Sequence, residues 1–346
     1  DVMPAAKPSG SNRIPAPAGP LRIEDEHSFG EHELLKQLTS GGFGEVWIAK
    51  ERGSGREVVL KRLKPEQAEN KRAYYQFDIE IEIGSRVKHP NLAPVLQNGM
   101  VDGRRFFTMP RITGPSMSRI LSGKVGAEWT LTENEMLAAL EGVARALGFL
   151  HRAGVVHCDV KPDNILFAAR NRPILIDLGI ARTVNWELTG FRALKGYRED
   201  KSILGTPEYM APEMFGGDPS AIGYPADLYA MGVILYELLA GRQPFQRLPD
   251  TTPSGGTTSL MELVGRVQVD AAPPLQEINP QVPAALAELT MACLAKKAED
   301  RLKNADELAV GIARVLRPIG PPTPKSKGGG GGGALGRLTR LLRKPK

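Results

Sequence analysis

The apolar pattern of this chain changes once, near Gly114, and that change limits the fold more than any other feature of the sequence. Between residues 29 and 110 the apolar residues come in short runs bounded by glycine, proline or charge, a pattern typical of β-strands. The runs are residues 46–49, 58–60, 92–96 and 106–109. One helical stretch, from Lys71 to about Val87, interrupts them. This part of the chain predicts a small sheet with a single helix.

Beyond that point the apolar residues follow the period of a helix. Thr132 and Glu135 have the spacing of a capping box, which predicts the start of a helix with an apolar face. Further helical stretches are residues 226–240, 259–268, 283–295 and 304–315, with a loop at 249–258. The sequence thus predicts an α+β fold, with a β-rich small lobe at residues 29–110 and a mainly helical large lobe at residues 111–316.

The two ends of the chain differ in composition from this body. Residues 1–28 are rich in proline and alanine and poor in large apolar residues, so burial cannot offset the entropy lost on ordering, and we expect disorder there. Residues 317–346 form a proline and glycine linker, with six consecutive glycines, followed by a basic amphipathic tail. The organisation expected is therefore one domain, residues 29–316, between two tails.

Net charge and cysteine content exclude several classes of protein. The net charge of +6 comes from the tail, because residues 325–346 hold seven Lys or Arg and no acidic residue, and the rest is close to neutral. A nucleic-acid-binding body would need a basic face that these totals do not show. Two cysteines cannot build a disulfide framework, and no apolar run approaches the ~18 residues of a membrane span. The compartment expected is the reducing cytoplasm.

The first candidate binding element is a glycine-rich segment, residues 38–46, between two predicted strands. Glycines there let backbone N–H groups approach phosphate oxygens, although a hairpin without a ligand explains the segment as well. The next strand places Lys61 on the same side as Val59, and alone this lysine is typical of a solubilising residue at a strand edge. Glu80 on the following helix is its candidate partner, and Glu82 competes for that role.

Three polar side chains beyond the capped helix give a sharper signal. Asp159 and Asn164 lie five positions apart, and Asp177 ends an apolar strand thirteen residues later. They offer a base and two hard oxygen ligands, which Mg²⁺ prefers when phosphates complete its coordination. The spacing therefore predicts a site for magnesium-assisted phosphoryl transfer.

The motifs of the last two paragraphs, taken in order, resemble those of the eukaryotic-type (Hanks-type) Ser/Thr protein kinases, especially the bacterial members. The resemblance runs from about residue 29 to residue 316. It implies a bilobal protein kinase fold with ATP between the lobes and magnesium, or manganese in its place, as the cation.

The resemblance also implies a catalytic role for five residues. Lys61 would contact the α- and β-phosphates while Glu80 holds it. Asp159 would accept the proton of the substrate hydroxyl, and Lys161 would steady the γ-phosphate. Thr206 begins a segment similar to the end of an activation segment, and it would lie near the catalytic aspartate.

By the same resemblance, Asn164 and Asp177 would hold the metal ion. The residues implied around the nucleotide are Leu38, Gly41, Gly42, Phe43, Gly44, Val46, Val59, Lys61, Met109, Pro110 and Ile112. Met109 takes the gatekeeper position. Pro110 lacks an N–H but keeps its carbonyl, which suffices because the N–H that adenine receives comes from the position of Ile112.

Two structural features follow from the resemblance as well. Glu213 would pair with Arg301 as a buried bridge. Asp227 and Gly232 match the anchor on the central helix of the large lobe.

The chain departs from the family pattern at three positions. Thr39 replaces the first glycine of the phosphate loop, so we expect weaker or slower nucleotide handling. Leu178 replaces the usual phenylalanine and can fill the same apolar slot. Cys158 replaces the arginine that pairs with a phosphorylated activation loop, so we expect activity that does not depend strongly on loop phosphorylation. An inert buried thiol is expected there, with a redox-sensitive thiol beside Asp159 as the alternative.

The C-terminal tail has leucines at helical spacing opposite basic residues, which are Arg337, Arg340 and Lys344. Its charges would attract an anionic membrane, nucleic acid or an acidic protein, and an unstructured solubilising tail is the alternative. A cytoplasmic protein that is peripheral at a membrane through this tail is the corresponding expectation.

The expected function is that of an ATP- and Mg-dependent serine/threonine protein kinase that acts on protein Ser/Thr hydroxyls, its own included. Lys161 followed by Pro162 resembles the Ser/Thr-specific version of the motif. One alternative is a catalytically weak pseudokinase that acts as a nucleotide-gated binding module, as Thr39 and Cys158 would allow. Another is a small-molecule phosphotransferase. A homodimer is left open, because many relatives pair through the small lobe.

Overall fold

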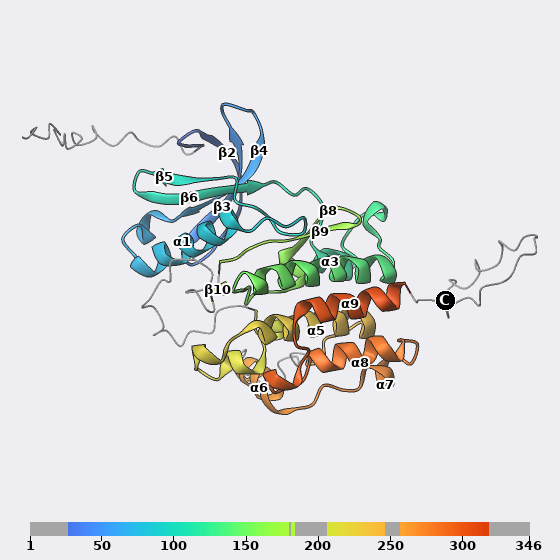
Figure 1. The fold of residues 1–346 in the computed structure, drawn as a ribbon. Helices are drawn as coiled ribbons and strands as arrows, with labels where there is room; N and C mark the ends of the chain where they lie inside the picture. Colours follow the sequence, from blue (N-terminus) through green and yellow to red (C-terminus); the bar gives the residue numbers. More distant parts are fainter. Residues whose placement is uncertain (1–26, 180, 184–205, 246–256, 318–346) are drawn as a thin grey trace, which may run out of the picture.

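The computed structural model describes residues 27–179, 181–183, 206–245 and 257–317, and within them the chain forms two lobes (Figure 1). The N-lobe contains one six-stranded antiparallel sheet in the order β1-β2-β3-β4-β6-β5. Its strands are β1 (Ser28–Phe29), β2 (His32–Ser40), β3 (Gly44–Glu51), β4 (Glu57–Leu63), β5 (Gln97–Val101) and β6 (Arg104–Pro110). Helix α1 (Lys71–Arg86) lies against this sheet, which confirms the predicted sheet with one helix.

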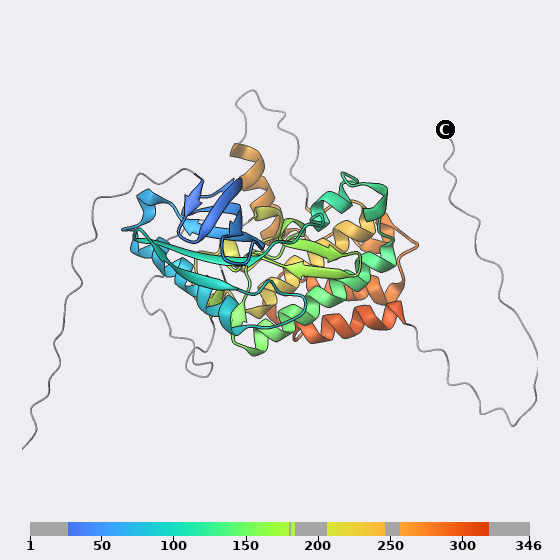
Figure 2. The same cartoon turned by 90° about the horizontal axis from the view of Figure 1, so that it is seen from above.

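Helix α1 belongs to the cores of both lobes. Its residues Ala73, Phe77 and Ile81 pack with Leu63 and Phe107 of the sheet. Its last turns instead place Ile83 and Val87 in the core of the C-lobe. The view from above shows α1 along one side of the sheet (Figure 2). The helix is therefore the element that fixes the N-lobe to the C-lobe.

The predicted strand at residues 92–96 is wrong. This stretch is a loop, in which Leu92 forms an isolated bridge with Leu175, and strand β5 starts only at Gln97. Pro94 lacks the N–H that a ladder requires, and Leu92 is buried in the C-lobe core rather than in the sheet. Its apolar residues reflect contact between the lobes, so a run of apolar side chains without clear alternation misled the prediction.

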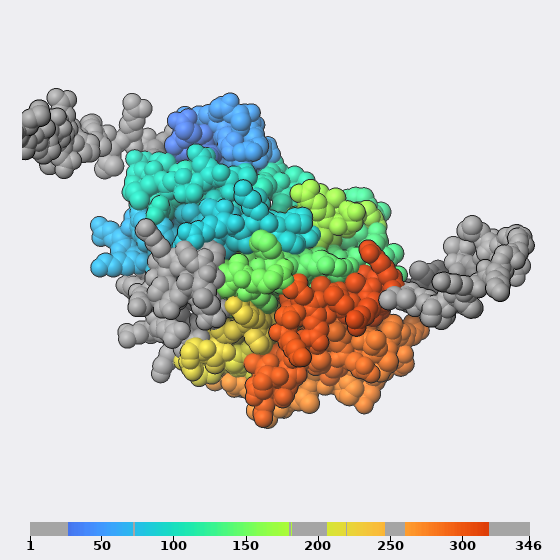
Figure 3. Space-filling view, viewed as in Figure 1, coloured from blue at the N-terminus to red at the C-terminus, as the bar shows by residue number. Residues whose placement is uncertain are grey.

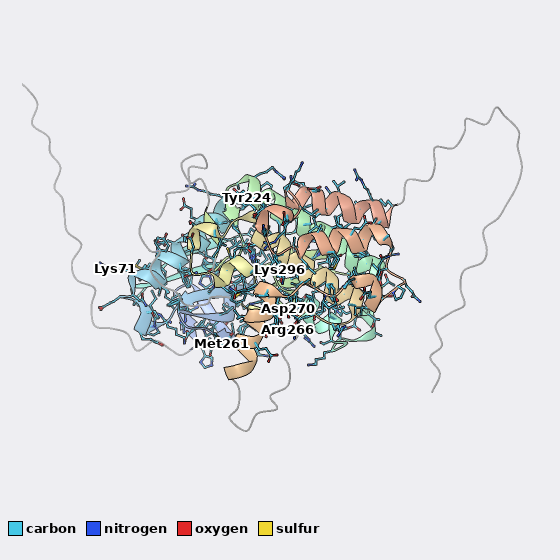
Figure 4. All side chains as sticks on the ribbon, turned by 90° about the horizontal axis from the view of Figure 1, so that it is seen from below. Lys71, Tyr224, Met261, Arg266, Asp270 and Lys296 are labelled. Atoms are coloured by element: carbon cyan, nitrogen blue, oxygen red, sulfur yellow. The ribbon has the colours of Figure 1, made fainter. Side chains whose placement is uncertain are left out.

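The C-lobe is mainly helical, as predicted. Its described helices are α2 (Met117–Leu121), α3 (Glu133–Arg152), α5 (Tyr224–Ala240), α6 (Thr257–Val269), α7 (Leu275–Ile278), α8 (Ala284–Cys293) and α9 (Ala305–Leu316). The capping box at the start of α3 is present, since Glu135 N donates to Thr132 Oγ1 and the Glu135 carboxylate accepts from Thr132 N. Lys296 connects the chain beyond α8 to the last turn of α6 (Figure 4).

Two short antiparallel pairs of strands lie on the C-lobe. They are β8 (Ile165–Ala169) with β9 (Arg172–Leu175), and β7 (Val155–Val156) with β10 (Arg182–Thr183). On the face shown in Figure 3 the N-lobe lies directly on the C-lobe. These strands therefore hold the segments that carry the predicted catalytic residues just below the sheet.

Several sequence-based expectations concern residues that the structure does not describe. These are residues 1–26 of the segment 1–28 that is expected to be disordered, most of the loop at 249–258, and the linker and tail from residue 318. At its end that expectation is wrong, because Ser28 belongs to strand β1 and pairs with Glu33. Among the described helices, none combines the length and the apolarity that a bilayer span requires.

Candidate active site

A partly buried ion cluster connects the two lobes. Lys61 lies on β4, where it pairs in register with Val46 and Phe107. Its Nζ atom donates to both carboxylate oxygens of Glu80 on α1, at 3.0 and 2.7 Å, and to Asp177 Oδ1 at 3.3 Å. The predicted partner Glu80 is thus the one observed.

The competing acid, Glu82, points elsewhere. Its carboxylate pairs with Arg86 one helical turn further along α1, at 2.9 Å. Glu80 and Glu82 are two positions apart, so on a helix they cannot face the same neighbour. Helix phase, which the sequence alone left open, decides between the two acids.

The three charges of the cluster shift one another's pKa values. Burial alone would lower the pKa of Lys61, but the nearby Glu80 and Asp177 carboxylates outweigh it and hold that pKa above its ordinary value. Lys61 in turn lowers the pKa of Asp177. Burial raises the pKa of Glu80 to about 7, against the attraction of Lys61. Lys61 therefore stays a cation that can meet phosphate oxygens.

The second group of polar residues gathers around Asp159. Asn164, in the short helix η3 (Pro162–Asn164), donates from Nδ2 to the Asp159 carbonyl at 2.8 Å and to Asp159 Oδ2 at 2.9 Å. Lys161 Nζ donates to the same Oδ2 at 2.8 Å and to Thr206 Oγ1 at 2.9 Å. Three residues of one predicted motif and Thr206 of a second thus form one hydrogen-bonded group.

The backbone of the Asp159 segment is held by Asp227 of α5. The buried Asp227 carboxylate accepts from His157 N and Cys158 N, both at 2.9 Å, and from His151 Nε2 at 2.8 Å. These bonds fix Cys158 at φ 65°, which is uncommon for a residue other than glycine. Asp227 is therefore the anchor that the resemblance implied.

His151 is a functional support that the sequence analysis missed. It occupies the last turn of α3, is buried, and stacks on Tyr224 with a centroid distance of 4.8 Å. The sequence offered one indication of this role, a histidine at the end of an otherwise apolar helix. Nothing local in the sequence identified Asp227 as its partner.

The residues expected around the nucleotide lie on strands β2, β3 and β4, in the turn between β2 and β3, and at or just beyond the end of β6. Gly41 N donates to the Gly44 carbonyl at 2.9 Å, which closes the tip of the glycine-rich turn. A Cβ on Gly44 would lie 3.0 Å from the Arg62 carbonyl, so a larger residue there would require this backbone to shift, whereas Gly42 faces open space. Leu38 is largely exposed.

Phe43 lies at the tip of this turn but packs toward α1. It contacts the apolar cluster of Leu63, Phe77 and Phe107. Phe77 and Phe107 also flank Lys61, whose Nζ lies 5.9 Å from each ring centroid. The structure thus places Phe43 beside the residues that position Lys61.

The predicted hinge follows β6. Val59 pairs with Met109, and Val58 pairs with Pro110, at the end of that strand, while Ile112 is half-buried just beyond it. Met109 lines a small cavity of about 20 Å³ together with Glu80 and Asp177. The gatekeeper position therefore borders the ion cluster, as expected for it.

The donor atoms fit a magnesium ion that phosphates help to bind. The Asn164 NH₂ group is used by Asp159, which leaves Oδ1 as the oxygen for a cation. Asp177 uses Oδ1 for Lys61 and for the N–H of Gly179 at 3.1 Å, and its side chain is 43% exposed, which leaves Oδ2 for a ligand. No group of three or more acidic, histidine or cysteine residues able to hold a metal exists among the described residues, so the phosphates must supply the other oxygens.

The departures from the family pattern have clear positions. Cys158 is buried, with Sγ 3.8 Å from the Val156 carbonyl, so the thiol is shielded from solvent. Leu178 is buried in the C-lobe core, which confirms that leucine fills this slot. Thr39 is a regular residue of β2 opposite Val46.

The structural pair in the C-lobe is also formed. Arg301 Nη1 and Nη2 donate to the two oxygens of Glu213, each at 2.7 Å. Gly232 of α5 is packed so closely that a Cβ would lie 2.6 Å from Cys293 Cβ. Three residues of the expected activation loop, Thr183, Thr189 and Ser202, are candidate phosphate acceptors by their sequence position. Thr189 and Ser202 lie outside the described residues, as does the side chain of Thr183.

Comparisons with known proteins agree with this geometry. The model of the protein kinase domain family matches residues 32–310. The chain is 32% identical to the serine/threonine-protein kinase PknD of Mycobacterium tuberculosis, over 82% of this chain and 39% of that protein. It is 34% identical to the DNA damage-responsive serine/threonine-protein kinase RqkA of Deinococcus radiodurans, over 81% of this chain and 39% of that protein.

Solved structures show the same fold. The kinase domain of Mycobacterium tuberculosis PknI superposes with a TM-score of 0.57 at 24% sequence identity, covering 83% of this chain and 97% of that domain. The chain spans about two fifths of the length of the curated relatives named above. By the match to the family model over most of its length, the chain belongs to the protein kinase family.

Proposed function

We propose that this chain is a serine/threonine protein kinase, which transfers the γ-phosphate of ATP to Ser and Thr hydroxyls of proteins and of itself. The observation that carries the proposal is the bonded group of Asp159, Lys161, Asn164 and Thr206. It joins a base and a cation to the segment that receives a polypeptide in this family.

The arrangement of Asp159 suits a general base. Among the described residues, the side-chain bonds that reach its carboxylate from Lys161 and Asn164 end on Oδ2. Oδ1 is thus left to accept the proton of a substrate hydroxyl. The bonds from Asn164 and Lys161 to Oδ2 fix the direction in which Oδ1 points.

Bound ATP supplies the phosphoryl group, and bound Mg²⁺ neutralises charge that develops on its oxygens. Lys61 offers a cation to the α- and β-phosphates, and Glu80 keeps it in place. Asn164 Oδ1 and Asp177 Oδ2 are the oxygens that would hold the metal. Orientation and charge supply most of the rate in such a site.

A test uses ATP labelled at the γ-phosphate, with the chain and a mixture of acceptor proteins. Label on protein serine or threonine is expected, with a loss of about 10²–10⁴-fold in Asp159→Asn. Label only on small metabolites would instead identify a small-molecule phosphotransferase. Nucleotide binding without transfer by the wild-type chain would identify the pseudokinase.

The location of the protein is a separate part of the proposal. We place it in the cytoplasm, with the basic tail beyond residue 317 assisting contact with an anionic membrane. Flotation with anionic vesicles should fall when residues 325–346 are removed. Equal flotation would reject the membrane, and competition by RNA or by an acidic protein would identify the other candidate partners.

The last part of the proposal is that two chains pair through their N-lobes. The apolar side chains Leu35, Leu96 and Met100 are exposed on this lobe. Leu96 and Met100 lie close together in the chain, just before and on the edge strand β5, whereas Leu35 lies on β2, with three strands between. A second copy of the lobe that pairs along β5 is the occupant that Leu96 and Met100 support. Sedimentation of wild type and of Met100→Lys would test it, since only the wild type should show a concentration-dependent dimer.

A further inference from the structure

Helix α1 is attached to the Asp177 turn by a second side chain besides Glu80. Gln76 lies one helical turn before Glu80, so both project from the same face of α1. While Glu80 binds Lys61, the Gln76 side-chain amide donates from Nε2 to the backbone carbonyl of Gly179. The helix therefore reaches the same turn through a charged contact and through a neutral one.

Gly179 lies at the centre of the ion cluster. A Cβ added there would lie 2.8 Å from Asp177 Oδ1, 3.3 Å from Lys61 Nζ and 3.5 Å from Glu80 Oε2. Its own N–H donates to Asp177 Oδ1 at 3.1 Å. The peptide groups of Gly179 thus contact the Asp177 carboxylate on one side and Gln76 on the other, so the Gln76 bond restricts how this turn is oriented.

The two parts of α1 contact different lobes. Its C-terminal part places Ile83 and Val87 in the C-lobe core. Its N-terminal part packs on the N-lobe cluster around Phe77, and there Tyr74 donates to the Gly103 carbonyl and Asp78 pairs with Arg105. Gln76 lies in that N-terminal part, and its bond to Gly179 connects this part of the helix to the Asp177 turn.

The residue before Asp159 makes this bond more important. A basic residue there could attract a phosphorylated loop, but Cys158 is neutral, buried and turned toward the Val156 carbonyl. A phosphate on the activation loop would therefore meet no cationic side chain at position 158. An uncharged amide bond from α1 can order the Asp177 turn without any phosphate.

We propose that Gln76 is a positioning residue, whose bond to the Gly179 carbonyl holds α1 and the Asp177 turn in the catalytic arrangement without loop phosphorylation. The inference rests on the proposed kinase function for its kinetic consequences. The bond itself is independent of activity, and it can be tested separately.

The test replaces Gln76 by Met, which has a similar length but no N–H donor, and by Glu, which keeps the size and removes the donor. Loss of one neutral hydrogen bond predicts a fall of about threefold to tenfold in kcat, with the KM for the protein substrate unchanged. Glu82→Gln is the matched control on the same helix, because Glu82 pairs with Arg86 away from the site. Its kcat should equal that of the wild type.

Two further measurements separate positioning from general stability. Amide hydrogen exchange in residues 176–179 should become faster in Gln76→Met while the thermal midpoint changes little, and this readout works even if the wild type transfers no phosphate. Phosphatase treatment of the wild type should change its kcat by less than about twofold, which is no more than the loss of one weak hydrogen bond would cause.

Three results would overturn the proposal. They are a kcat and an exchange rate in Gln76→Met that equal those of the wild type, an equal loss in Glu82→Gln, or a large loss of kcat after phosphatase treatment. If the Met variant does not fold, the Glu variant and its exchange rates decide in the same way.

Discussion

The molecule holds two ion pairs, Arg301 with Glu213 and Lys61 with Glu80, which differ in how completely the hydrogen-bonding capacity of the cation is used. In the C-lobe, all five N–H donors of Arg301 have acceptors, which are the two Glu213 oxygens and the carbonyls of Ala295, Lys296 and Pro225. Its side chain is 0% exposed. Between the lobes, Lys61 is 18% exposed and is shared by Glu80 and Asp177.

This difference separates a structural pair from a functional one. A guanidinium with five acceptors fixed in one plane has no capacity for a further ligand, so the Arg301 pair can only hold elements together. The Lys61 ammonium is a compact charge. Its longest hydrogen bond, 3.3 Å to Asp177 Oδ1, can be exchanged for a bond to a phosphate oxygen. Because the hydrogen-bonding capacity of the Lys61 ammonium is only partly used within the cluster, the cluster can still bind a ligand.

The first way to test this comparison is Asp177→Asn, which should have the largest effect on activity. It removes the proposed metal ligand and one of the two carboxylates around Lys61, so we expect kcat/KM to fall by about 10²–10³-fold. The free energy of unfolding should change by less than about 1 kcal/mol, because the Asp177 side chain is 43% exposed and its ion pair is screened. Steady-state kinetics and urea unfolding of the same preparation measure both.

The converse variant is Arg301→Met in the C-lobe. Glu213 would then be buried without a partner, and we expect a loss of about 3–5 kcal/mol in the free energy of unfolding. The kcat of the molecules that remain folded should be close to that of the wild type. A stable Arg301→Met enzyme with low kcat would contradict the division of roles drawn above.

The sequence predicted the polar residues of the site better than their supports. Lys61, Asp159, Asn164 and Asp177 were identified because each ends or follows a short recognisable motif. Distances between motifs are set by the fold, so the bonds of Gln76 to Gly179 and of His151 to Asp227 had no signal in sequence spacing.

The fold shows the same division. Helices with capping and periodicity were predicted within a few residues, as for α3 and α9. The stretch at residues 92–96 was mistaken for a strand because its apolar residues serve contact between lobes rather than a sheet. Capping and periodicity therefore predict helices well, whereas tertiary contacts decide whether a short apolar run forms a strand or a loop.

A smaller effect tests the helix that carries Asp227. In Gly232→Ala the new Cβ would lie 2.6 Å from Cys293 Cβ and 3.2 Å from Leu294, so α5 and α8 must separate. We expect a loss of about 1–3 kcal/mol in the free energy of unfolding, as for other overpacked cores. Gly265→Ala on α6 is the matched control, since nothing lies within 4 Å of its Cβ position. That variant should be stabilised by up to about 1 kcal/mol, because alanine favours a helix.

The smallest effect concerns a third cation, Lys296. Its Nζ donates to the carbonyls of Arg266 and Val267 at the end of α6, lies 4.1 Å over the Phe245 ring, and has Asp270 nearby (Figure 4). Burial lowers its pKa to about 8, with a further contribution from Arg301, while Asp270 opposes the shift. Lys296 is thus less well compensated than Lys61 or Arg301.

A lysine whose pKa is lower in the folded chain than in the unfolded chain binds fewer protons when folded. Above the unfolded pKa of about 10.5 Lys296 is neutral in both states and does not lower the free energy of unfolding. As the pH falls from there through about 8, the unfolded chain gains the proton first, and the free energy of unfolding decreases. Urea unfolding of the wild type between about pH 7.5 and 9.5 should show a free energy of unfolding that rises with pH, relative to Lys296→Met. Lys297→Met is the control, because that neighbour is exposed and should leave the slope unchanged. Parallel curves for the wild type and Lys296→Met would mean that the carbonyls of α6 compensate this ammonium fully, which would place Lys296 with Arg301 among the structural cations.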